Sequence, residues 1–81
     1  MARIHFSTPL RRFTGGVAEV DLDAPTVQAL ITELDRRFPG IAEPLNEGTA
    51  VAIDGEIIAQ ATYEPIPEGA DVHFVTAPVG G

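Results

Sequence analysis

Residues 26–40 read TVQALITELDRRFPG, and this stretch decides the fold class. Its apolar side chains recur at i, i+3, i+4, i+7 and i+11, which places them along one face of a helix. The stripe consists of Val27, Leu30, Ile31, Leu34 and Phe38. The hydroxyl of Thr26 can cap the first turn, and Pro39-Gly40 stops the helix. The pattern predicts one amphipathic helix with a single buried face.

Strand patterns lie on both sides of this helix. Before it, apolar and polar residues alternate over 4–6 and 18–22, and the loop between them, residues 10–16, ends in a Gly-Gly pair that suits a hairpin. After it, strands are predicted at residues 49–53, 56–59 and 71–75, with a short helical turn at 41–45 and an Asp-Gly turn at 54–55. This order predicts an α+β domain of the β-grasp type, a mixed sheet of about five strands with the helix on one face. Its first and last strands are expected to be adjacent and parallel in the sheet centre.

Composition narrows the function classes. The chain has 81 residues, enough for one small domain, and its hydrophobic share of 44% is that of a folded globule. Cysteine is absent, which excludes disulfides, thiolate metal sites and cysteine nucleophiles. The net charge of −7 disfavours nucleic-acid binding. No apolar run is long enough to span a membrane and the opening residues predict a strand, not a signal peptide, so we expect a cytoplasmic protein.

The charges are unevenly distributed. Arg3, Arg11 and Arg12 lie in the first twelve residues, which contain no acid, and all twelve acidic residues follow them. An acidic body suits a basic protein partner. The alternative is that the charge only keeps a small domain soluble.

Side-chain chemistry is sparse. His5 and His73 are expected on neighbouring strands, on the sheet face away from the helix, but no third ligand has metal-site spacing, so ordinary surface histidines are the better interpretation. Ser7 and Thr8 cannot form a triad with His5, because adjacent strand residues point to opposite faces. We expect no intrinsic active site, no metal and no bound cofactor.

The C-terminus is the informative feature. Gly80 and Gly81 end the chain shortly after Pro78. Glycine permits close backbone approach, and proline favours an extended tail. A thin peptide that ends in a carboxylate can enter a narrow channel in a partner. We therefore expect a β-grasp domain at residues 1–76 and a flexible tail at 77–81, although many ordinary chain ends contain glycine.

The sequence resembles the ubiquitin-like sulfur carriers. This family includes the small subunit of molybdopterin synthase, the sulfur carrier of thiamin biosynthesis and a carrier of one cysteine-biosynthesis route. The matching pieces span most of the chain and lie at residues 4–6, 10–16, 25–27, 51–55, 66–72 and 80–81. The sequence departs from the family pattern at Ala70, where Asp is frequent, and at Pro78, which lies nearer the end than usual.

The resemblance implies a mechanism at the main-chain end. A ubiquitin-activating-enzyme-like partner would use ATP to adenylate the Gly81 carboxylate, and a sulfur donor would then displace AMP to leave a thiocarboxylate. A sulfur-accepting synthase subunit would take the sulfur. The chain would be a carrier and co-substrate and not an enzyme, or at most the non-catalytic small subunit of molybdopterin synthase.

The residues expected to carry this function fall into three groups. Gly81 and Gly80 would carry the chemistry. The tail would be guided into its channel by Ala77, Pro78 and Val79. Docking would involve Phe13, Val75 and part of the His73 face, with ordinary packing as the alternative for Phe13 and Val75.

The acceptor pathway stays open at this point. We expect molybdopterin synthesis first, and cysteine or thiamin synthesis otherwise. A different class is a ubiquitin-like protein-binding or conjugation module without sulfur transfer. A third, an RNA-binding β-grasp module, conflicts with the acidic charge.

Overall fold

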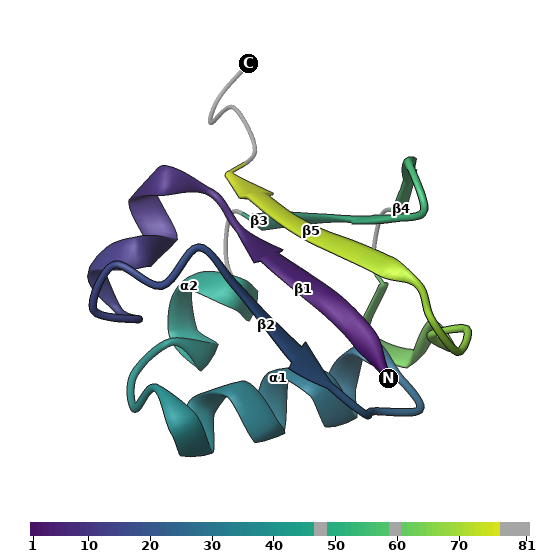
Figure 1. The fold of residues 1–81 in the computed structure, drawn as a ribbon, viewed down its shortest axis with the longest axis horizontal. Helices are drawn as coiled ribbons and strands as arrows, with labels where there is room; N and C mark the ends of the chain where they lie inside the picture. The colour runs from purple at the N-terminus through teal and green to yellow at the C-terminus, as the bar shows by residue number, and fades with distance from the viewer. Residues whose placement is uncertain (47–48, 59–60, 77–81) are drawn as a thin grey trace.

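The computed structural model describes residues 1–46, 49–58 and 61–76. Two layers make up the domain, one a five-stranded sheet and the other helical (Figure 1). The elements in chain order are β1 (Ala2–Phe6), η1 (Thr8–Arg12), β2 (Glu19–Leu22), α1 (Val27–Arg37), α2 (Ala42–Asn46), β3 (Thr49–Ile53), β4 (Glu56–Ile58), η2 (Ala61–Tyr63) and β5 (Asp71–Thr76). The α+β prediction is confirmed.

The strand order in the sheet is β2-β1-β5-β3-β4. β1 pairs with β5 in parallel, and all other neighbours are antiparallel. The first and last strands therefore share the sheet centre, which confirms the β-grasp arrangement. Since they are parallel, β5 ends at the same edge of the sheet where β1 ends and η1 begins.

The helix α1 forms where the apolar stripe predicts it. The Thr26 hydroxyl accepts a hydrogen bond from the Ala29 backbone N–H at 3.2 Å, so the predicted cap is present. The α-helical hydrogen bonds end at Phe38, whose N–H donates to the Leu34 carbonyl at 2.7 Å. None of the helices in the described part of the chain is long and apolar enough to cross a membrane.

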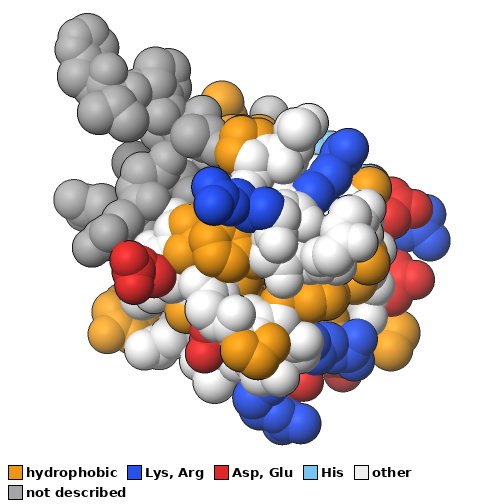
Figure 2. Space-filling model, turned by 90° about the vertical axis from the view of Figure 1, so that its left-hand side faces the viewer, with side chains coloured by type: hydrophobic (Ala, Val, Ile, Leu, Met, Phe, Trp, Pro, Cys, Tyr) orange, Lys and Arg blue, Asp and Glu red, His pale blue; other side chains and the backbone are white. Residues whose placement is uncertain are grey.

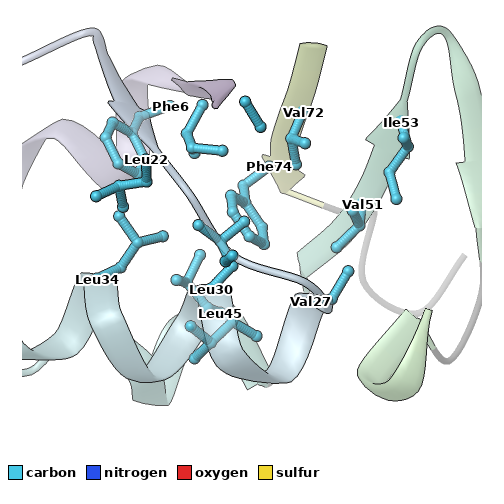
Figure 3. Packing of buried hydrophobic residues seen from close by; sticks show 14 of the residues in the cluster. Phe6, Leu22, Val27, Leu30, Leu34, Leu45, Val51, Ile53, Val72 and Phe74 are labelled. Carbon is cyan, nitrogen blue, oxygen red and sulfur yellow. The ribbon is translucent and has the colours of Figure 1, made fainter. Parts of the chain in front are cut away.

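The core lies between α1 and the inner face of the sheet (Figure 3). Leu30 and Leu34 have no exposed surface, and neither has Phe74 of the central strand opposite them. Phe38, the last residue of the stripe, is only half-buried, and its ring packs edge-to-face on Phe6 with 5.9 Å between centroids. The helix phase predicted from the sequence is correct.

The structure differs from the predictions mainly after β1. Residues 10–16 were expected to form a loop, but Thr8–Arg12 is a 3₁₀ helix. Pro9 near its start fixes a φ angle that suits a helix. Leu10 is buried in the core, where its side chain is 3% exposed. Gly15 and Gly16 do adopt positive φ angles, 68° and 94°. The strand predicted at 18–22 begins one residue later, the strand predicted at 71–75 ends one residue later, and the turn predicted at 41–45 is a short helix at 42–46. Ala59, predicted to end a strand, lies outside the described residues.

The helix phase can be tested at Leu34. Leu34→Ala removes a fully buried side chain, and we expect it to lower the free energy of unfolding by about 2–5 kcal/mol. Arg36→Ala, on the exposed side of the same helix, should change it by less than about 0.5 kcal/mol. Urea denaturation of both variants measures the difference. Equal stabilities would show that this face of α1 does not pack on the sheet.

Candidate functional site

The sheet face opposite α1 carries a row of side chains that crosses all five strands. The register pairs His5 with Glu19 and with His73, and Ala52 with His73 and with Ile57. Residues directly paired across strands point to the same face. The row therefore changes from charged at β2 to apolar at β4, where Ile57 is 71% exposed.

The two histidines lie in the middle of this row. Their rings stack with 4.1 Å between centroids and an interplanar angle of 7°. The Nδ1 of His5 lies 3.2 Å from a Glu19 carboxylate oxygen, and its Nε2 lies 3.1 Å from Asp71. The predicted placement on neighbouring strands of the open face is confirmed. Within residues 1–46, 49–58 and 61–76, no group of three His, Cys, Asp or Glu side chains is arranged to hold a metal ion. The contacts of His5 instead hold β1 to the strands on both sides.

The end of the open face where β5 begins is charged. Arg3 pairs with Asp21, Nε to Oδ1 at 3.2 Å, and this hydrogen bond raises the pKa of the Arg3 guanidinium. Asp71 follows on β5, opposite Arg3 in the register. The Asp71 N–H donates to the Asp54 carboxylate at 3.0 Å, and the Asp54 N–H donates to the Asp71 carbonyl at 2.8 Å. The carboxylates of Asp21 and Asp54 are therefore held by contacts within the sheet at this end.

The opposite end of the face, where β5 ends, is hollowed. The hollow has a volume of about 370 Å³ and is lined by side chains that include His5, Ser7, Arg11, Glu19, His73 and Val75. Val75 is 37% exposed and pairs with Ala50 of β3. The structure thus brings Val75 and His73, both predicted as docking residues, into one concave surface.

Phe13 lies elsewhere. Its side chain is half-buried and packs against the core, and the Arg12 guanidinium lies over its ring at 5.7 Å from the centroid. This packing on the core is the alternative that the sequence left open for Phe13. Docking would use only the exposed part of the ring.

Sequence reasoning did not identify three side chains of the open face and its hollow. Arg11 and Glu19 line the hollow beside Val75, and Ile57 supplies the largest apolar exposure of the open face. Strand alternation alone could have placed Glu19 with His5, but Arg11 enters the hollow only because Thr8–Arg12 forms a 3₁₀ helix.

Thr14 holds the segment that follows this helix. It is the one buried polar side chain of the described residues, 5% exposed. Its hydroxyl lies 2.8 Å from the Val17 carbonyl and 3.2 Å from the Arg11 carbonyl. The Thr-Gly-Gly piece of the family resemblance therefore works here as a turn that fixes the end of η1.

The tail residues predicted to carry the chemistry, Ala77, Pro78, Val79, Gly80 and Gly81, lie outside the described residues. The structure does give their starting point, at the end of central strand β5. Five residues can extend at most about 17 Å from that point.

The model of the ThiS family matches residues 4–81, nearly the whole chain and including both terminal glycines. The chain belongs to this family of ubiquitin-like sulfur carriers. A search of curated proteins gives no match.

Solved structures share the fold of this ThiS-family chain. CysO from Mycobacterium tuberculosis aligns with a TM-score of 0.86 at 22% identity, over 96% of this chain and 100% of that one. A chain of the BexX/CysO complex from Amycolatopsis orientalis aligns with a TM-score of 0.87 at 22% sequence identity, over 100% of both chains. A putative molybdopterin converting factor subunit 1 from Pyrococcus furiosus aligns with a TM-score of 0.77 at 18% sequence identity, over 95% of this chain and 97% of that one.

The hydrogen bonds of Thr14 give a prediction about the turn that follows η1. Thr14→Val keeps the side-chain shape but removes the hydroxyl, so the Val17 carbonyl loses the donor at 2.8 Å, whereas the Arg11 carbonyl still accepts from the N–H groups of Thr14 and Gly16. We expect a loss of about 0.5–1.5 kcal/mol in the free energy of unfolding, the net worth of one hydrogen bond. The matched change at exposed Thr8 should have little effect. Thermal unfolding of the two variants compares them, and an unaffected Thr14→Val would mean that the turn does not depend on this hydroxyl.

Proposed function

We propose that this chain is a sulfur carrier whose Gly81 carboxylate is adenylated and then converted to a thiocarboxylate. The observation that carries the proposal is the family match, which runs through the terminal diglycine and covers all but the first three residues of the β-grasp domain. The absence of cysteine fits this chemistry, since the sulfur would be held on the main chain and not on a side chain.

The reaction would take place in the partner. A Gly81 carboxylate oxygen attacks the α-phosphate of ATP bound by a ubiquitin-activating-enzyme-like partner, and pyrophosphate leaves. A donor of sulfur at the sulfide oxidation level then attacks the acyl carbon, and AMP leaves. The thiocarboxylate sulfur then bonds to the acceptor, and water cleaves the carbon–sulfur bond, which leaves the sulfur on the acceptor and returns Gly81 to a carboxylate. The chain itself binds no cofactor in this scheme, and ATP belongs to the partner.

The fold supports the scheme because it gives the tail a rigid base. β5 is hydrogen-bonded on both sides, to β1 and to β3. Its Val72 and Phe74 side chains have no exposed surface. A reacting group at the end of a short tail is positioned well only if the point where the tail starts is fixed.

The partners follow from the same scheme. A sulfur-accepting synthase subunit would dock on the hollow beside Val75 and on the apolar side of the open face. Subunits 1 and 2 of the molybdopterin-converting factor from Helicobacter pylori form a protein–protein complex, which contains a further structural neighbour of this chain. We expect no role for nucleic acid or membrane, and a cytoplasmic location.

The acceptor pathway is a separate question. Molybdopterin synthesis is the first pathway to test, and cysteine and thiamin synthesis are the alternatives. Supplying the thiocarboxylate form of the chain to each acceptor system in turn, and measuring product, separates the three.

Protein conjugation is the competing function. Another structural neighbour is small archaeal modifier protein 1 from Methanosarcina acetivorans, with a TM-score of 0.81 at 15% identity. Intact-mass analysis after incubation with the activating system distinguishes the two functions. Sulfur transfer replaces one oxygen of the chain by sulfur, whereas conjugation yields adducts to lysines of other proteins.

Removal of Gly81 tests the proposal directly. The shortened chain should fold normally, because the tail lies beyond the β-grasp core. It should not support ATP–pyrophosphate exchange by the adenylating enzyme, because the carboxylate no longer reaches the site of reaction. Exchange at the rate of the full chain would refute the carrier function.

Gly80→Ala tests the width of the partner's channel. A Cβ next to the reacting end would displace it, and a misplacement of about 1 Å can cost roughly a hundredfold in rate. We expect that loss in kcat for adenylation or sulfur transfer, with unchanged thermal unfolding. Arg36→Ala, at an exposed position of α1, serves as the control for adenylation. If Gly80→Ala reacts as fast as the parent chain, the penultimate glycine has no role in the chemistry.

A further inference from the structure

Two arginines stand out because neither forms an ion pair with an acidic residue in the described part of the chain. Three of the five basic residues form ion pairs, Arg3 with Asp21, and Arg36 and Arg37 with Glu33. Arg11 and Arg12 form none with any residue in the described part of the chain, although the sequence contains twelve acids. A chain with a net charge of −7 thus keeps two cations unpaired.

Both arginines are nevertheless held in place. The Arg11 Nε donates to the Phe6 carbonyl at 3.2 Å, and the Arg12 guanidinium lies over the Phe13 ring. Both side chains are exposed. Their charges are therefore oriented by the fold and open to solvent, which suits recognition by another molecule.

Their position connects them with the tail. η1 begins directly after β1, and the Ser7 N–H donates to the Phe74 carbonyl at 3.2 Å, so η1 starts beside the end of β5. Arg11 and Val75 line the same hollow. Figure 2 shows basic side chains next to hydrophobic ones on this side of the molecule, with most acidic side chains toward the margins. Arg11 therefore lies next to the point where the chain leaves β5, and Arg12 is the next residue of the same 3₁₀ helix.

We propose that Arg11 and Arg12 bind carboxylates on the adenylating partner, at the rim of the channel that receives the tail. This inference rests on the proposed function and adds the chemistry of the partner surface. Guanidinium groups pair with carboxylates through two parallel hydrogen bonds, which fixes direction as well as distance. Glu19, the one carboxylate in the hollow, is 3.2 Å from His5 and does not neutralise Arg11.

The acidic residues of the open face also favour one orientation of the chain on the partner. Asp21, Asp54 and Asp71 lie at the opposite end of the open face. An acidic rim repels that end and attracts the arginine end, so the tail points into the channel before contact is made. This arrangement reverses the expectation of a basic partner drawn from net charge alone, because the local charge at the docking point is positive.

Charge reversal at Arg12 tests the inference. Arg12→Glu removes no hydrogen bond and should fold normally, as thermal unfolding will verify. In ATP–pyrophosphate exchange with the adenylating enzyme, we expect its KM to rise about tenfold or more with kcat unchanged, because docking is lost and chemistry is kept. The control is Arg36→Glu, which makes the same charge change at a 76% exposed side chain on α1 and should leave KM within about twofold.

A second variant and ionic strength extend the test. Arg11→Gln should also raise KM, and added salt should raise the KM of the parent chain more than that of Arg12→Glu. Equal KM values for Arg12→Glu and Arg36→Glu would overturn the inference, while adenylation of both would leave the proposed function standing. If neither the parent chain nor any variant is adenylated at Gly81, the proposed function and this inference are both wrong. Binding of labelled single-stranded RNA that is lost in Arg12→Glu would assign the arginines to nucleic acid and also overturn the inference.

Discussion

The parallel pairing of β1 with β5 is the interaction on which the rest of this structure depends. It joins the first and last described strands of the chain in the centre of the sheet, with Ile4 opposite Val72 and Phe6 opposite Phe74. These four side chains are at most 2% exposed, so the pairing also forms the middle of the core. Parallel strands cannot be joined by a tight turn, and the intervening chain supplies the helices and the outer strands.

This pairing also decides where the C-terminal tail begins. Because β5 lies between β1 and β3, its end is fixed at the centre of one edge of the sheet and not at a loose side strand. Parallel direction brings the start of η1 to the same edge. In the proposed function the carrier reacts through its main-chain end and needs no catalytic side chain, and the domain would supply a fixed base for the tail and a surface that identifies the partner.

The open face shows how a small domain separates these two tasks. At its charged end the acids are held by contacts within the sheet, Asp21 by Arg3, and Glu19 and Asp71 by His5. Its hollowed end keeps unpaired groups beside an apolar patch. Interfaces combine apolar area with a few oriented polar contacts, and here both kinds of group meet only near the end of β5.

The sequence by itself determined the elements that depend on local patterns. The stripe and cap of α1 depend on residues within a few positions of one another, and the diglycine end is readable without any structure. Tertiary packing decided the rest. Residues 8–12 form a 3₁₀ helix because Leu10 can be buried against a core built by distant strands. Arg11 joins Val75 in one hollow only because parallel pairing aligns segments more than sixty positions apart. Local sequence patterns carry no information about such pairings, since the contacts form between residues that are neighbours only in the folded chain.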